Sequence, residues 1–183
     1  MFSLSKQQLT ILGLASSLYF ILVIVRVNTT SLMWRYLIIG SVFIIAAIID
    51  LFTYTLPDIL TLGGALLGFL LPGNDVISSI KGSLAGLVIM SFIAAVSRGG
   101  MGGGDVKLAL TMGSFLGWPL VLPALGLSFL LGGSFGLILL MTKVKDRTDS
   151  IPFGPFLTLG TLIVSLWGQE LIQWYLTSIW RQP

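Results

Sequence analysis

Long apolar segments dominate this chain and restrict what it can fold into. Runs of mainly apolar residues occupy 9–25, 34–50, 77–96, 120–141 and 156–180. An α-helix needs about 20 such residues to cross the hydrocarbon core of a bilayer. Only 9% of the 183 residues are charged, whereas 55% are hydrophobic, so the chain lacks the polar side chains that cover a soluble protein. These features predict an all-α fold, a polytopic helical bundle in a lipid bilayer.

Two shorter apolar segments, at about 61–71 and 106–117, bring the expected number of transmembrane helices to about six or seven. Pro57 breaks the helix that precedes it, and Asp58 is then placed to cap the next one. No linker is long enough to separate domains. We therefore expect a single integral-membrane domain over 1–183, with a motif-bearing core at about 34–168.

The absence of cysteine and histidine limits the available chemistry. Thiolate nucleophiles and disulfides are excluded, and so are the commonest general base and the commonest zinc ligands. Any reaction must use Asp, Glu, Lys, Ser, Thr or Tyr, and we expect neither a metal site nor a cofactor. The net charge of +3 suggests basic residues that flank membrane spans rather than a nucleic-acid surface.

The basic residues also predict an orientation, because cytoplasmic loops carry an excess of Lys and Arg. With a cytoplasmic N-terminus and seven alternating segments, six basic residues fall inside and four outside. The inside set is Lys6, Arg98, Lys107, Lys143, Lys145 and Arg147, and the outside set is Arg26, Arg35, Lys81 and Arg181. The same alternation places Asp50, Asp58 and Asp105 together on the cytoplasmic side.

The segment RGGMGGGDVKLAL, at 98–110, sets an acid beside bare backbone. An acid in a membrane protein is costly to keep and often functional. Gly102, Gly103 and Gly104 lack Cβ atoms, so they permit a positive φ and the close approach of an extended substrate backbone. We assign these glycines to substrate binding and Asp105 to catalysis. The alternative is a flexible loop in which Asp105 is the N-cap of the following helix.

Asp50 is the candidate partner of Asp105, because both are expected at the same membrane face. Two neighbouring carboxyl groups cannot both ionise easily and share a proton. One can then activate a water while the other polarises a carbonyl, which hydrolyses a peptide bond without a covalent intermediate. The alternative interpretation of Asp50, taken without Asp105, is a charged residue at the membrane boundary. Lys107 points to another face of its helix and is expected to hold a lipid phosphate or a nearby loop.

Residues 132–136, GGSFG, fit the G-x-S-x-G pattern of serine hydrolases. That motif needs a strand, a sharp turn and a histidine partner, and this chain has no histidine. Helix packing through small residues explains the pattern better.

Three motifs together resemble the type IV prepilin peptidases, a family of G-x-G-D membrane aspartic proteases. GMGGGDVKLAL matches the G-x-G-D motif, DLFTYTLPDILTLGG at 50–64 matches the other aspartate segment, and IPFGPFLTLG at 151–160 matches the C-terminal signature. The resemblance implies that Asp50 and Asp105 are the catalytic pair. Asp58 matches an L-P-D position that is not catalytic; we place it with the substrate-binding residues and keep it as the second choice.

The resemblance also implies the substrate and the compartment. The enzyme would act in a bacterial or archaeal plasma membrane, on prepilins or pseudopilins with a basic N-terminal leader. It would cut at the cytoplasmic face and serve type IV pili or protein secretion. Many members carry an N-terminal segment with paired cysteines that is associated with N-methylation. We expect a form without it, with peptidase but no methyltransferase activity.

Two other classes of function stay open. A small ion-coupled transporter would place acids near the middle of the bilayer, in broken helices. A noncatalytic subunit of a pilus or secretion assembly would keep the fold without cleaving. Cleavage by the purified protein separates these three possibilities.

Overall fold

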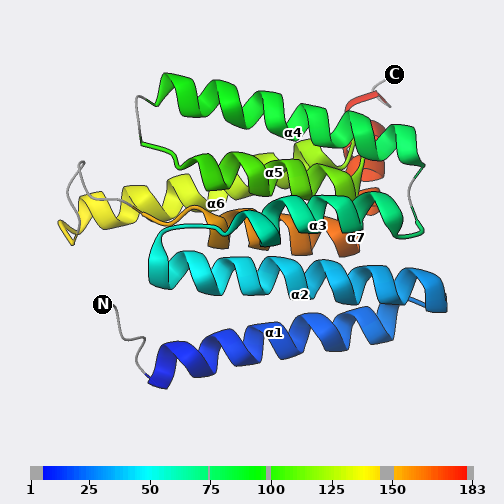
Figure 1. The fold of residues 1–183 in the computed structure, drawn as a ribbon, viewed down its shortest axis with the longest axis horizontal. Coiled ribbons are helices and arrows are strands. Elements are labelled where there is room, and N and C mark those ends of the chain that lie inside the picture. The colour runs from blue at the N-terminus through cyan, green and yellow to red at the C-terminus, as the bar shows by residue number, and fades with distance from the viewer. Residues whose placement is uncertain (1–5, 74, 98–99, 145–150, 181–183) are drawn as a thin grey trace.

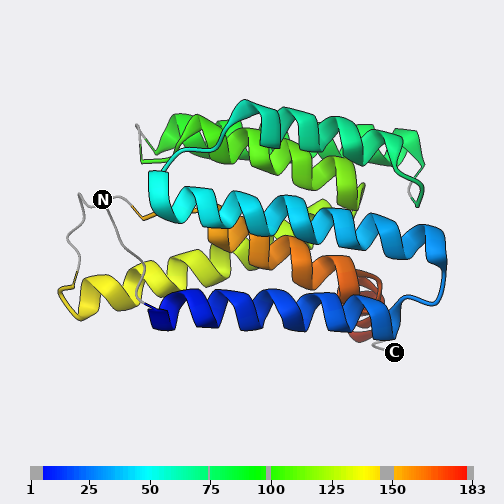
Figure 2. The same ribbon diagram turned by 60° about the horizontal axis from the view of Figure 1, so that its bottom comes forward.

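The structure, a computed structural model, describes residues 6–73, 75–97, 100–144 and 151–180. The described residues form seven helices and no strand, which confirms the all-α prediction. The helices are α1 (Lys6–Arg26), α2 (Thr30–Thr53), α3 (Asp58–Leu70), α4 (Val76–Val96), α5 (Gly103–Leu116), α6 (Val121–Met141) and α7 (Gly154–Trp180). They lie side by side, and successive helices run in opposite directions along the long axis (Figures 1 and 2).

Four of the described helices are long and apolar enough to cross a membrane. The spans are Leu32–Thr53, Val76–Val96, Val121–Met141 and Gly154–Ser178. Parts of α1 and α3 are apolar but shorter than a full span. Large apolar side chains are exposed on the outer helices, including Val88, Phe92, Leu130 and Met141. A bilayer would cover such a surface, so this is a multi-pass membrane protein.

Helix α5 is the central element of the bundle. It packs against α3, α4 and α7, and most of its residues from Leu108 to Leu116 are buried. Small residues make this burial possible, since a Cβ on Gly82 of α4 would lie 2.5 Å from the carbonyl oxygen of Gly113. Helices in membranes often meet through such small residues. Gly86 of α4 makes the same kind of contact, because a Cβ on it would lie 2.4 Å from the carbonyl oxygen of Ala109 in α5.

We expect Gly82→Ala to destabilise the bundle by about 1–3 kcal/mol, because the added methyl group meets backbone that cannot move aside cheaply. Thermal unfolding in detergent micelles would measure the change. Gly126→Ala is the matched control, because a Cβ on Gly126 in α6 has no atom within 4 Å. Equal unfolding temperatures for the two variants would contradict the proposed contact.

The ends of three helices position the candidate site. Helix α2 ends where Tyr54 adopts a left-handed conformation, with φ of 55°, and its N–H bonds to the carbonyl oxygen of Asp50. Pro57 follows shortly afterwards, as is common beyond a helix C-terminus. Asp50 therefore lies in the last turn of α2, while Asp105 lies in the first turn of α5. Because α2 and α5 run in opposite directions, these two turns lie at the same end of the bundle.

Neither Asp58, which was predicted to be an N-cap, nor Asp105, for which an N-cap was the alternative role, is the N-cap of its helix. The N-cap of α3 is Pro57 and that of α5 is Gly102, and neither helix has a side-chain cap bond. Each aspartate lies inside the first turn of its helix instead. A carboxylate is favourable there because of the helix dipole, but its oxygens stay available for other partners.

Three further expectations concern the start of α5, the G-x-S-x-G pattern and the basic residues used for the orientation. Helix α5 begins at Gly103, earlier than the expected 106, because the glycines themselves adopt helical geometry. Residues 132–136 lie within α6, where no serine-hydrolase turn exists. Arg98, Lys145, Arg147 and Arg181, used for the orientation, lie outside the described residues, as does most of the charged segment at 143–149.

Candidate active site

A pocket of about 290 Å³ lies at the end of the bundle where α2 ends and α3 and α5 begin. Residues from these three helices, and from the short segments before and after them, form its walls. They are Asp50, Tyr54, Thr55, Leu56, Asp58, Gly102, Gly103, Gly104, Asp105 and Lys107. The structure thus brings together every residue that the sequence assigned to catalysis or substrate binding.

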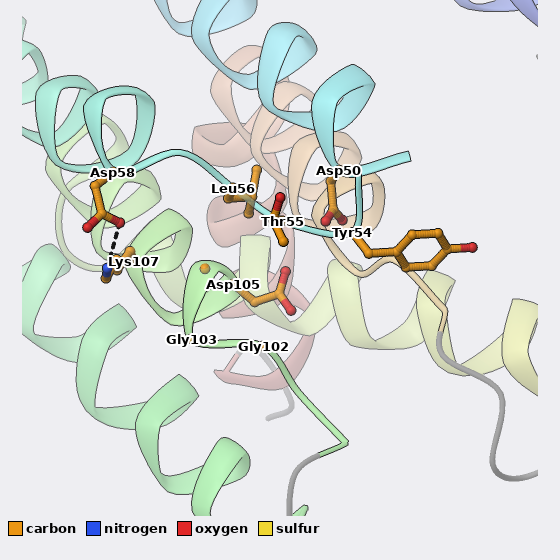
Figure 3. A pocket seen from close by; sticks show the side chains of 10 residues that line it. Asp50, Tyr54, Thr55, Leu56, Asp58, Gly102, Gly103, Asp105 and Lys107 are labelled. Carbon is orange, nitrogen blue, oxygen red and sulfur yellow. Dashed lines mark hydrogen bonds and ion pairs between the residues drawn. The ribbon is translucent and has the colours of Figure 1, made fainter. Parts of the chain in front are cut away.

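Both candidate catalytic aspartates are almost fully buried. Asp50 is 5% exposed and Asp105 is 8% exposed. Figure 3 shows their carboxyl groups facing the space between the end of α2 and the start of α5. Among the described residues, no hydrogen bond joins the two carboxyl groups directly. The pocket that both residues line is large enough to admit a water molecule or a peptide carbonyl group.

Asp50 is held by the first residue of α7. The Gly154 N–H donates a hydrogen bond of 2.8 Å to Oδ2 of Asp50. A Cβ on Gly154 would lie 2.7 Å from that same oxygen, so a larger residue would displace the carboxyl group. A backbone N–H at a helix N-terminus is a favourable partner for a carboxylate. Gly154 therefore orients Asp50 toward the pocket.

Asp105 lies outside the four candidate spans, in a buried environment. Burial raises the pKa of its carboxyl group to about 7, the negative charge of Asp50 adds to the rise, and the Gly102 N–H opposes it. An acid with such a pKa is protonated in a large fraction of molecules near neutral pH. The pocket can therefore present a protonated carboxyl group beside a second carboxyl group.

The three glycines serve the site differently from the expectation. Positive φ angles occur at Gly73 and Gly117 but not at Gly102, Gly103 or Gly104, so that part of the prediction is wrong. The helix begins among these residues, which requires ordinary negative φ angles. Close approach does occur, but it involves the protein's own chain, since a Cβ on Gly104 would lie 3.0 Å from that of Leu56.

Gly103 is different, because a Cβ placed on it would have no atom within 4 Å. Its backbone is exposed at the pocket, as is that of Gly102. These two residues, rather than Gly104, leave space for another extended backbone.

Asp58 and Lys107 form an ion pair at the rim of the pocket. Nζ of Lys107 lies 2.5 Å from Oδ1 of Asp58, and the two side chains are 41% and 63% exposed, respectively (Figure 3). A pair this exposed contributes little to stability. Lys107 therefore contacts the first residue of helix α3, whereas a lipid phosphate or a nearby loop was expected. Asp58 is not buried with the two candidate catalytic residues.

Sequence reasoning did not identify Gly154 as part of the site. The signals that could have indicated it are its place between two prolines in IPFGPF, at 151–156, and the resemblance of this segment to the C-terminal signature. Tyr54, Thr55 and Leu56 were also missed, because nothing in their residue types indicates that they form a pocket wall. Among the described residues, no three acidic side chains gather into a set that could hold a metal ion.

The sequence of this chain matches a known protein family. The sequence model of the type IV leader peptidase family matches residues 37–137, more than half of the chain, including both buried aspartates. The chain belongs to the type IV leader peptidase family. Resemblance to the prepilin peptidases is thereby confirmed at the level of the family.

Curated relatives agree with this family assignment. The chain is 36% identical over 155 residues to a prepilin leader peptidase/N-methyltransferase of Aeromonas salmonicida, covering 78% of this chain and 52% of the relative. It is 35% identical over 176 residues to the protein of that name in Legionella pneumophila, covering 91% and 59%. The Bacillus subtilis (strain 168) protein is 31% identical over 99 residues, covering 54% and 40%.

The chain thus spans about half the length of the curated relatives that it matches. No solved structure of another protein matches it.

Proposed function

We propose that this protein is a membrane aspartic endopeptidase that removes the leader peptide of type IV prepilins or pseudopilin-like proteins. One observation carries the proposal: two buried aspartates from different helices line one pocket at the end of a membrane bundle. Membership of the leader peptidase family supports the substrate class. The names of the curated relatives support it as well.

The surroundings of the two acids suggest different roles. Asp50 accepts the Gly154 N–H, which favours a carboxylate that can serve as general base toward a water molecule. Asp105, with its raised pKa, would be the protonated member that donates a hydrogen bond to the scissile carbonyl oxygen. As water attacks, Asp50 takes the proton that the water loses and Asp105 gives its proton to the carbonyl oxygen, which forms a tetrahedral diol. Asp50 then gives its proton to the leaving nitrogen, the C–N bond breaks, and a hydroxyl of the diol returns a proton to Asp105, so that both groups regain their starting states.

The pocket also suggests where the substrate lies. A peptide in the extended form could run beside Gly102 and Gly103, whose backbone is exposed. Asp58 stands at the rim, and its exposed carboxylate could exchange Lys107 for a basic residue of the leader. These assignments extend the glycine and Asp58 predictions from binding in general to particular parts of the substrate.

The orientation of the bundle supports cleavage at the cytoplasmic face. Lys6 and Lys107 lie toward the pocket end, whereas Arg26, Arg35 and Lys81 lie toward the other end. Positive residues favour the cytoplasmic side, so the pocket would face the cytoplasm of a bacterial or archaeal cell. The plasma membrane is the corresponding location.

A transporter is less well supported. Asp50 lies three residues from the end of its helix and Asp105 lies in the first turn of another, so neither occupies the middle of a span. A cleavage assay with purified protein and a prepilin tests the proposal directly. Release of the leader by the purified protein is the expected result, and an intact prepilin after prolonged incubation would contradict it.

The rate of cleavage should depend on the protonation of Asp105. Because its pKa is raised to about 7, the protonated form predominates below that pH and is lost as the pH rises through it. We therefore expect kcat/KM to fall on the alkaline side of about pH 7. Initial rates from pH 5 to 9 would show this, in roughly half-unit steps, with Asp58→Asn as a control whose profile keeps the same alkaline limb. A flat profile across this range would contradict the assigned role.

A further inference from the structure

A buried arginine lies far from the pocket, near the beginning of α2. Arg35 is 3% exposed, and no ion pair to it occurs among the residues that the structure describes. Its guanidinium donates to the carbonyl oxygens of Leu71, at 2.9 Å, and Pro72, at 3.0 Å. It also donates to the carbonyl oxygen of Phe115. Three backbone carbonyl groups thus accept hydrogen bonds from this buried charge, and the Phe115 ring lies 6.0 Å from its central carbon.

Those carbonyl groups belong to the C-terminal ends of two helices. Leu71 and Pro72 follow the last residue of α3, and Phe115 is in the last turn of α5. The final carbonyls of a helix have no partner within the helix and carry a partial negative charge. The planar guanidinium suits this position, because its N–H groups point in several fixed directions. Arg35 therefore joins α2 to the far ends of α3 and α5.

The three helices that meet at Arg35 are those that form the pocket. Asp50 is at the other end of α2, Asp58 begins α3, and Asp105 is in the first turn of α5. Helix α2 runs in one direction between the two ends, and α3 and α5 run in the other (Figures 1 and 2). At 1.5 Å per residue, Arg35 lies roughly 20 Å from Asp50 along α2.

Hydrogen bonds have a preferred geometry, so the bonds of Arg35 resist the sliding of α5 along α2. Helices α2 and α5 make few direct backbone contacts with each other. Most of the contacts that link them run through α3 and α7, which pack against both helices. Apolar contacts between them include the rings of Phe43 and Phe115, whose centroids lie 6.3 Å apart. Hydrophobic contact is not directional, so it resists sliding less than a hydrogen bond of defined geometry.

We propose that Arg35 is a positioning residue that sets the axial alignment of α5 and α3 relative to α2. Through this alignment it determines where Asp105 stands relative to Asp50. The role in catalysis rests on the proposed peptidase function, whereas the alignment itself does not. A small misplacement of catalytic groups is costly, because a shift of about 1 Å can lower the rate by about 100-fold.

The first test compares Arg35→Lys with Arg26→Lys in the prepilin cleavage assay. Lysine keeps the positive charge, but its single nitrogen cannot reproduce the fork that reaches three carbonyl oxygens. We expect kcat to fall about tenfold or more, with KM changed by no more than about threefold, because Asp58 on α3 and Lys107 on α5 would shift together and keep their pairing at the rim. Arg26 is the matched control, since it pairs with the exposed Glu170 of α7 and holds neither α3 nor α5.

The second test measures alignment without catalysis. The chain contains no cysteine, so introduced thiols react alone. Tyr54→Cys and Gly103→Cys place one thiol at the end of α2 and one at the start of α5, both at the pocket. Both positions are exposed, and a Cβ on Gly103 meets nothing within 4 Å. A short bifunctional thiol reagent should crosslink this pair severalfold more slowly when Arg35→Lys is added, and equally fast with Arg26→Lys.

The outcomes separate the alignment from the enzyme activity. If the parent protein cleaves no prepilin, the peptidase proposal fails, and the crosslinking rate alone decides the role of Arg35. An unchanged crosslinking rate in Arg35→Lys overturns the positioning role, even if kcat falls. If the lysine variant does not enter the membrane, Arg35→Gln is used in both tests, because it keeps an N–H donor without a charge.

Discussion

Asp105→Asn is expected to abolish leader cleavage while the protein still enters the membrane. The amide cannot donate or take up the proton that the reaction needs, although its shape is nearly the same. Asp50→Asn should have the same effect, because an amide cannot accept a proton from water. We expect each variant to lose at least about 1,000-fold in kcat/KM.

The measurement is the rate of leader release from a prepilin in detergent or in vesicles. The double variant should be no slower than either single variant, because residues that act as a unit are not additive. Asp58→Asn tests the second-choice acid, which is exposed, pairs with Lys107 and is assigned to leader binding rather than to the reacting atoms. It should retain cleavage within about tenfold of the parent protein. Cleavage retained by Asp105→Asn or Asp50→Asn, or lost only in Asp58→Asn, would refute the assigned pair.

The second large effect is expected at Gly154. The substitution Gly154→Ala adds a methyl group 2.7 Å from Oδ2 of Asp50, which is closer than the two atoms can approach. The carboxyl group must therefore move away from the position in which it accepts the Gly154 N–H. Because misplaced catalytic groups lose rate steeply, we expect kcat to fall by about 10- to 100-fold.

Gly133→Ala is the control for this substitution. Gly133 lies in α6, and a Cβ on it meets no atom within 4 Å. Its cleavage rate should match that of the parent protein. The stability of Gly154→Ala should also stay close to that of the parent, since the three atoms nearest to the added methyl group all belong to the Asp50 side chain and none to the backbone. A normal kcat in Gly154→Ala would show that Asp50 is not oriented by this contact.

Several features of the fold could be predicted because they depend on local composition. Helices that are apolar over about 20 residues are stable in a bilayer. The number of such helices follows from the proline, glycine and charged residues that interrupt the apolar sequence. The common location of Asp50, Asp58 and Asp105 also followed, because alternating helices return every second connection to the same face. No contact between particular side chains was needed for these conclusions.

Other features depended on contacts between distant segments. The prediction of positive φ at Gly102–104 failed because helix α5 begins among these residues. The residue at which a run of glycines becomes helical depends on the chain that packs beside it, and the run itself does not indicate it. The capping roles of Asp58 and Asp105 failed for a similar reason. Each carboxylate has another environment, an ion pair for Asp58 and a buried pocket for Asp105.

The amino-acid sequence alone establishes a membrane bundle and a pair of acids beside a glycine turn, because apolar length and residue chemistry are properties of each segment by itself. The tertiary structure decides what those acids meet. Gly154 reaches Asp50 from α7, and Arg35 links the far ends of α3 and α5 to α2. These contacts join residues far apart in the chain, and their geometry exists only once the helices have packed.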